Sequence, residues 1–315
     1  MIVRRLLAIV PIMLAVTFLI FLLTAFLPGD EAVTLAGENA SAERIVEVRE
    51  ALNLDRPIIP RYLDWIERAV QGDLGRSLFT NQNVVTEIAA RWVITLQLVI
   101  GSLIFSLLIG IPIGMSAARF RGRWPDRVFT LMSSVGISIP SFVFGIYLML
   151  VFSVWLGILP FAGYVPFSED PLQWAKQLVL PIAAMSSGMI AELSRQTRSA
   201  LIDSLDSDYI RTARAKGMSE TKIIGKHAMR VAVSPVLSIV SVHVARAFGG
   251  AIVIERIFAL PGLGAMTVDA ITQRDLPLLQ GVIPLAVVVA MSVTLLSDII
   301  NFKINPRLQF DGKSQ

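Results

Sequence analysis

The segment "DYIRTARAKGMSE", Asp208–Glu220, interrupts a chain that is otherwise dominated by apolar runs. It contains three basic residues, two acidic residues and one glycine. Ser207 or Asp208 is suited to cap a helix N-terminus, and Gly217 is suited to end that helix. Ser219 is suited to cap a following helix. The predicted apolar face of that second helix consists of Ile223, Ile224, His227, Ala228 and Val231. The segment therefore predicts a short helix, a glycine bend and a second helix.

The composition places this segment in an integral membrane protein. Of the 315 residues, 54% are hydrophobic and 17% are charged, and the mean hydropathy is +0.67. A soluble domain with so much apolar surface would aggregate. The absence of cysteine excludes disulfides and thiolate metal sites, and two histidines are too few for a metal site without carboxylates. The net charge of +4 comes from basic residues beside apolar runs, so we expect contact with membrane lipid and not with nucleic acid.

Six apolar runs are long enough to be membrane-spanning helices, since crossing the hydrocarbon core takes about 20 residues. The runs are Leu6–Leu27, Trp92–Ala118, Val128–Leu159, a run that begins near Leu178, Val231–Ile254 and Leu278–Ile300. Pro140 interrupts the third run and is expected to bend it or to shape a pore. The fourth run is short, because Glu192 and Arg195 follow it closely. The fold class is therefore all-α, with six transmembrane helices.

The distribution of charge predicts the orientation of the chain. Lys and Arg are concentrated before the first span, after the second, between the fourth and fifth, and after the sixth, so both termini and the 204–230 loop are expected in the cytoplasm. Residues 28–91 contain eleven acidic and seven basic residues and are expected to form a small helical cap outside. We therefore divide the chain into an N-terminal helix (1–27), an external loop (28–91), a five-helix core (92–303) and a cytoplasmic tail (304–315).

Two helices are predicted in the external loop. "SAERIVEVREALNL" has a loose helical pattern, and "IIPRYLDWIERAVQGDLG" places Leu63, Ile66 and Val70 on one face before a stop at Gly72. The loop is either a solvated lid or a docking surface for an external partner. The 208–220 segment has two interpretations as well. It is either a linker whose Arg211, Arg214 and Lys216 contact lipid phosphates, or a rigid knob that fits a cytoplasmic partner.

The extended segment "DYIRTARAKGMSETKIIGKHAMRVAVSPV" resembles the cytoplasmic loop of ABC importer permeases of the dipeptide, oligopeptide and nickel branch. The other similar segments, in the right order, are "FLPGD", "QGDLGRSL", "GISIPSFVFGIYLMLVFS", "LGILPFAGY", "LVLPIAAM", "IVIERIFALPGLG" and "INPRL". The general importer pattern is Glu-Ala-Ala, three residues, then Gly. Here Arg211, Thr212 and Ala213 precede Gly217, so the Glu is absent, as is usual for this branch. The resemblance covers nearly the whole chain.

This resemblance implies a type I ABC importer permease that translocates cargo by alternating access and is not itself an enzyme. The short helix would be the coupling helix, with Tyr209, Arg211, Ala213 and Gly217 as the residues that contact an ATPase. Two ATPase subunits, which bind ATP and Mg²⁺, a related but different second permease chain and an external solute-binding protein are the implied partners. No cofactor is expected in this chain. The implied location is the prokaryotic inner membrane, and the implied cargo is di- or oligopeptides.

Other functions remain as alternatives at this stage. The same branch includes importers of glutathione and nickel. A secondary transporter driven by an ion gradient should show paired acidic residues near the bilayer midplane and inverted repeats, and neither is evident in the sequence. An intramembrane enzyme would need converging side chains. Its only candidates are Glu192, His243 and Asp298, and nothing in their spacing joins them.

Polar residues inside the spans are candidates for function, since buried charge is costly in a membrane. His243 and Arg246 lie one turn apart on the fifth span and are expected to face the interior. Arg246 would either pair with a partner chain or attract a cargo carboxylate. Glu255 belongs to the "E-x-x-F-x-x-P-G-x-G" segment and is interpreted as a helix-end anchor in preference to a substrate contact. Asp298 lies near the inner interface, where pairing with a basic residue is expected.

Overall fold

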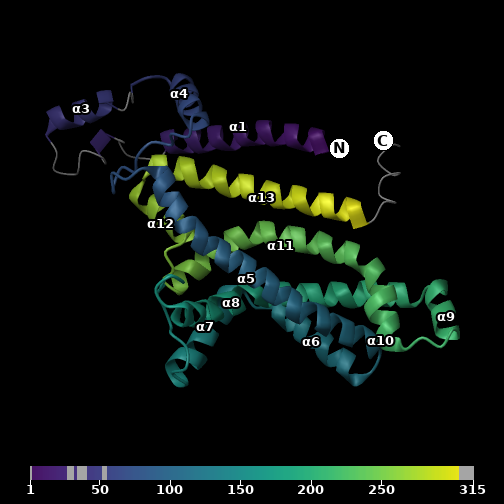
Figure 1. Ribbon diagram of the computed structural model, residues 1–315. Coiled ribbons are helices and arrows are strands. Elements are labelled where there is room, and N and C mark those ends of the chain that lie inside the picture. The colour runs from purple at the N-terminus through teal and green to yellow at the C-terminus, as the bar shows by residue number, and fades with distance from the viewer. Residues whose placement is uncertain (1, 27–31, 34–40, 52–54, 305–315) are drawn as a thin grey trace. The chain divides into compact units, whose positions relative to one another are not determined.

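The computed structural model describes residues 2–26, 32–33, 41–51 and 55–304, and its ordered elements there are helices (Figure 1). The helices are α1 (Ile2–Phe26), α3 (Ala42–Ala51), α4 (Ile58–Val70), α5 (Val84–Arg119), α6 (Trp124–Ser138), α7 (Ser141–Met149), η1 (Leu150–Trp155), α8 (Pro171–Leu205), α9 (Asp208–Ala215), α10 (Glu220–Lys222), η2 (Ile223–Ala228), α11 (Met229–Ile257), α12 (Leu263–Gln273) and α13 (Leu276–Ile304). The "PGD" of the first loop and the tail after Ile304 lie outside the described residues.

Each of the six predicted spans corresponds to an apolar helical segment. Within the described residues, three helical stretches are long and apolar enough to cross a membrane, namely Val84–Arg119, Pro171–Leu205 and Glu220–Val244. The pair formed by α6 and the helix Ser141–Trp155 becomes a fourth if it is counted as one span. Shorter apolar stretches lie in α1 (Val10–Leu22) and in α13 (Leu276–Ser292). The prediction of an all-helical membrane protein is therefore confirmed.

The third span is broken at Pro140, as predicted. Ile139 is extended, with φ −87° and ψ 120°, which is the conformation that a following proline favours. Helix α6 therefore ends at Ser138, and α7 starts at Ser141 after Pro140. The two helices differ in direction by 98°, which is far more than an ordinary proline kink.

The prediction that the fourth span is short was wrong. Helix α8 has 35 residues and continues through Glu192 and Arg195 to Leu205. It begins at Pro171, and the Asp170 side chain caps it by accepting hydrogen bonds from the backbone N–H groups of Leu172 and Gln173, both at 3.0 Å. Hydropathy alone underestimated the helix, because polar side chains along α8 have partners on other helices.

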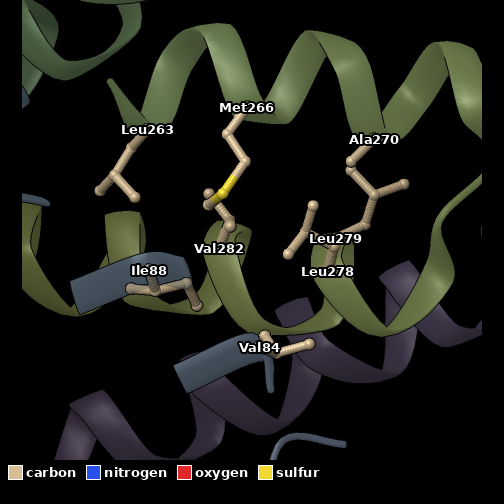
Figure 2. Close-up of a cluster of buried hydrophobic side chains, with 8 residues drawn as sticks. All are labelled: Val84, Ile88, Leu263, Met266, Ala270, Leu278, Leu279 and Val282. Atoms are coloured by element: carbon tan, nitrogen blue, oxygen red, sulfur yellow. The ribbon is translucent and has the colours of Figure 1, made fainter. Parts of the chain in front are cut away.

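The chain divides into two compact units, and each is described by itself. The first unit contains Met1–Ile94 and Pro261–Met291. One of its apolar clusters joins the start of α5 to α12 and to the first turns of α13 (Figure 2). The cluster consists of Val84, Ile88, Leu263, Met266, Ala270, Leu278, Leu279 and Val282. Gly281 allows the close approach of α13, because a Cβ there would lie 2.7 Å from Cγ1 of Val84.

A second cluster in the first unit joins α4 to α1, and it corrects the predicted face of α4. Tyr62 and Trp65 are the buried residues of α4, whereas Leu63 and Val70 are 57% and 82% exposed. The Tyr62 hydroxyl donates a 2.8 Å hydrogen bond to the carbonyl of Leu14 in α1. The aromatic rings, which are larger than the aliphatic side chains, therefore determine which face of α4 packs. The predicted stop at Gly72 is confirmed by its φ of +87°.

The second unit contains Thr95–Leu260 and Ser292–Gln315, and α8 is its central helix. In this unit α8 packs against α6, α7 and α11 (Figure 1). The α5 segment of this unit also approaches α8 closely. A Cβ at Gly114 would lie only 2.5 Å from the carbonyl oxygen of Ser194. Small residues of this kind let membrane helices pack backbone against backbone.

Candidate functional site

The predicted short helix and glycine bend are present at residues 208–217. Helix α9 (Asp208–Ala215) ends in a Schellman motif, in which Gly217 N–H donates to the Arg214 carbonyl at 2.9 Å and Met218 N–H donates to the Ala213 carbonyl at 3.3 Å. Gly217 has φ +76°, a conformation that favours glycine. The glycine is therefore required by the backbone of the bend, as the sequence predicted.

The inner face of α9 is fixed to the rest of the second unit. Ile210 is fully buried and Ala213 is 8% exposed. Both belong to one apolar cluster that also contains Ala118, Leu201, Ile223, Ile224, Ala228 and Ala232. An eight-residue helix is unstable in isolation, so this cluster supplies the packing that holds α9 in place.

The helix after the bend follows the prediction at its start and departs from it later. Ser219 occupies the N-cap position, and Ile223, Ile224 and Ala228 are buried. However, Val231, which was predicted to be on the apolar face, is 56% exposed. Ala232 is buried in its place. The reason is the π-helical segment η2, because its wider turn moves the buried face by one residue.

Two of the predicted contact residues are exposed on the outer face of α9. Tyr209 is 45% exposed, and its hydroxyl lies 2.5 Å from the Ser204 hydroxyl at the end of α8. Arg211 is exposed, and its side chain is 3.2 Å from that of Asp208, a surface pair of little energetic value. The predicted contact residues thus lie in different environments: Tyr209 and Arg211 on the surface, Ala213 in the cluster and Gly217 in the bend.

Ion pairs connect the two ends of the 208–220 segment to neighbouring residues. Arg214 and Glu220 form a 2.7 Å ion pair across the glycine bend. The hydrogen bond from this guanidinium to Glu220, together with the charge of the carboxylate, raises the pKa of Arg214 above its ordinary value. Arg121 pairs with Asp206 at 2.8 Å, just before α9. The loop after α5 is therefore connected to the turn just before α9.

A partly buried ion pair that sequence reasoning missed lies between α6 and α8. Arg198 donates to both carboxylate oxygens of Asp126, with Nη2 to Oδ2 at 2.8 Å. The same carboxylate accepts a 2.9 Å hydrogen bond from the backbone N–H of Gly122. No local sequence motif predicts this pair, because its members are 72 residues apart. It holds the start of α6 against α8.

Three polar side chains meet between α8 and α11. The Glu192 carboxylate lies 2.8 Å from Nε2 of His243 and 4.0 Å from Nη1 of Arg246. The expectation that nothing joins Glu192 and His243 was therefore wrong. Sequence spacing could not have found the pair, because its members are 51 residues apart and on different helices. We call these three residues the Glu192 cluster.

The last two polar candidates differ in what the structure shows. Glu255 is fully buried near the end of α11, and its carboxylate accepts a 2.6 Å hydrogen bond from the Thr95 hydroxyl in α5. Its backbone carbonyl accepts a 2.8 Å bond from Leu260 N–H, which closes the end of the helix. These contacts suit a helix-end anchor. Asp298 lies in α13, and its side chain is outside the described residues.

The helix arrangement is that of an ABC importer permease. Two inward-facing structures of the MetNI methionine ABC transporter match it, with TM-scores of 0.55 and 0.59 at 19% and 17% sequence identity. The matches cover 69% and 70% of this chain and 96% of each matched chain. At these identities the likeness shows the fold, which is the type I importer fold expected from the sequence.

Sequence comparison then gives the family. Residues 110–310 match the family described as "Binding-protein-dependent transport system inner membrane component", and residues 1–99 match the N-terminal domain of such components. The chain belongs to this family of inner-membrane transport permeases. It is 39% identical over 311 residues, 99% of both chains, to a Brucella abortus (strain 2308) protein whose name describes a peptide transport system permease. It is also 39% identical over 307 residues, 98% of both chains, to the glutathione transport system permease protein GsiC of Salmonella typhimurium.

Proposed function

We propose that this chain is the translocating subunit of an ATP-driven importer for di- or oligopeptides. The observation that carries the proposal is the geometry of α9. Its inner face is packed into the permease through Ile210 and Ala213, while Tyr209 and Arg211 remain exposed on its outer face. When a partner displaces a short helix that is held in this way, the displacement is transmitted to the membrane-spanning helices that pack against it.

The partner that displaces α9 is proposed to be an ATPase. Two ATPase subunits would bind ATP and Mg²⁺, and closure of that pair would move α9 and turn the pathway outward. A different but related permease would complete the pathway, and an external solute-binding protein would deliver the cargo. The proposed topology places both termini and α9 in the cytoplasm, because Lys and Arg are concentrated in those segments.

Peptide cargo is supported by the Brucella relative, whose name refers to peptide transport. Glutathione is the second candidate, because the Salmonella relative at the same identity is named for glutathione transport. Glutathione is itself a modified tripeptide, so the two cargoes are chemically close. Nickel, an alternative at the level of sequence, has no support from these relatives. An ion-driven carrier has none either.

Uptake by cells that lack this chain tests the proposed cargo. The deletion strain should lose accumulation of a labelled dipeptide or tripeptide and should regain it when the chain is restored. Labelled glutathione and nickel ions are measured in parallel with the same cells. Loss of glutathione uptake alone would favour the second candidate, and loss of nickel uptake alone would contradict the peptide assignment.

A further inference from the structure

The Glu192 cluster has an uneven geometry that its role must explain. His243 is 13% exposed and lies 2.8 Å from Oε2 of Glu192, so this contact is short and largely shielded. Arg246 is 69% exposed and lies 4.0 Å from the same oxygen, at the limit of an ion pair. Glu192 itself is 33% exposed. Glu192 thus lies close to His243, whose Nε2 is not aligned for a hydrogen bond, and farther from Arg246.

The cluster also lies well inside the helices that carry it. Glu192 is 13 residues from the end of α8, which corresponds to about 20 Å at 1.5 Å per residue. Arg246 is 17 residues from the start of α11 and 11 residues from its end, so it lies about 25 Å and about 16 Å from them. A guanidinium at this depth is costly when it faces lipid. Its exposed face therefore points to water or to another polar group.

The long contact with Glu192 also leaves hydrogen-bond donor capacity on Arg246. Both His243 and Arg246 make their shortest contact with Oε2 of Glu192. A guanidinium has five N–H donors in a planar fork that matches a carboxylate, and a single contact at 4.0 Å uses little of this capacity. A second carboxylate can therefore reach Arg246 without first breaking a strong bond.

We propose that Arg246 forms a subsite, here called the station, that binds a carboxylate of the cargo. Glu192 is the counter-ion of Arg246 within the chain. When the station is empty, Glu192 offsets the charge of Arg246. When cargo arrives, its carboxylate binds the guanidinium of Arg246, while Glu192 stays next to His243. His243 is a positioning residue, since it acts through Glu192. This inference rests on the proposed peptide function and adds a subsite to it.

The test uses the assembled transporter with its binding protein in proteoliposomes. The cargo pair is trialanine with a free C-terminal carboxylate and trialanine amide. The same binding protein is used with each variant. Its own preference for the acid or the amide therefore cancels when the acid-to-amide ratios of the variants are compared. Arg246→Gln should lower kcat/KM for the acid by about tenfold relative to the amide, the loss expected for a charged hydrogen bond. Glu192→Gln should do the opposite and lower the KM for the acid, because the competing carboxylate is gone.

The outcomes separate this inference from the proposed function. If the unmodified transporter takes up neither form of trialanine, the peptide function fails and the inference falls with it. If it takes up trialanine and the acid-to-amide ratio is the same in Arg246→Gln, only the station is contradicted. If Arg246→Gln prevents assembly, the KM of Glu192→Gln for the acid is the measurement that tests the station. An unchanged acid KM in that variant would show that Arg246 pairs with a partner chain and not with cargo.

Discussion

Asp126 and Arg198 form a doubly hydrogen-bonded ion pair between α6 and α8, with Nε to Oδ1 at 2.5 Å and Nη2 to Oδ2 at 2.8 Å. Asp126 is 6% exposed and Arg198 is 29% exposed. The pair lies on the same two helices that Ser133 and Ser194 join by a 2.9 Å hydrogen bond. It therefore strengthens the contact between α6 and α8.

Asp126→Asn should destabilise the permease measurably. Asn can keep one hydrogen bond but leaves the partly buried guanidinium of Arg198 without its counter-charge. Since breaking a fully buried pair costs about 3–5 kcal/mol, we expect about 2–3 kcal/mol for this one. The matched control is Asp206→Asn, which breaks the exposed pair with Arg121 and should change stability by less than about 1 kcal/mol. Thermal unfolding of the purified complexes measures both, and equal shifts would contradict the assignment.

Replacement of Gly217 tests the bend without adding a clash. A Cβ at Gly217 would meet no atom within 4 Å, so any effect comes from the backbone, whose φ is +76°. Gly217→Val should cost about 1–3 kcal/mol at the bend and lower ATP-driven uptake, while cargo still binds the binding protein. Gly217→Asn should retain most uptake, because asparagine tolerates this conformation. Normal uptake in the valine variant would rule out a coupling role for the bend.

The two faces of α9 should respond differently to substitution. Arg211→Glu changes an exposed residue, so it should weaken co-purification of the ATPase while the melting temperature of the permease stays the same. Ala213→Leu overfills the cluster around Ile210 and should lower that temperature, with a cost of about 1–3 kcal/mol. If the two variants had the same effects on both quantities, α9 would not have separate docking and packing faces.

The topology is testable because the chain contains no cysteine. Ser41 and Ser219 are both exposed, so a single cysteine at either position should be reachable by a reagent. An impermeant maleimide added to intact cells should label Ser41→Cys, and Ser219→Cys only after the membrane is opened. Labelling of both positions from outside would overturn the proposed orientation.

Local chemistry explains which features could be predicted from the sequence. The bend at Gly217 and the break at Pro140 depend on the backbone preferences of single residues, so both were correct. The burial of Ala232 in place of Val231 depends on a π-turn, which no periodicity of 3.6 residues reveals.

Contacts between helices could not be read in the same way. The length of α8 was underestimated because Glu192 and Arg195 resemble the end of a span when their partners are unknown. The Glu192–His243 contact joins residues from different helices, and hydropathy contains no information about such pairs.

Uptake by reconstituted proteoliposomes tests whether this chain imports cargo by coupling to an ATPase. The permease pair, the ATPases and the cargo-loaded binding protein are combined, and labelled peptide inside the vesicles is measured. We predict accumulation with ATP and Mg²⁺, and none with a non-hydrolysable ATP analogue or with an imposed proton or sodium gradient. Accumulation driven by either ion gradient in the absence of ATP would contradict ATP-driven import by this chain.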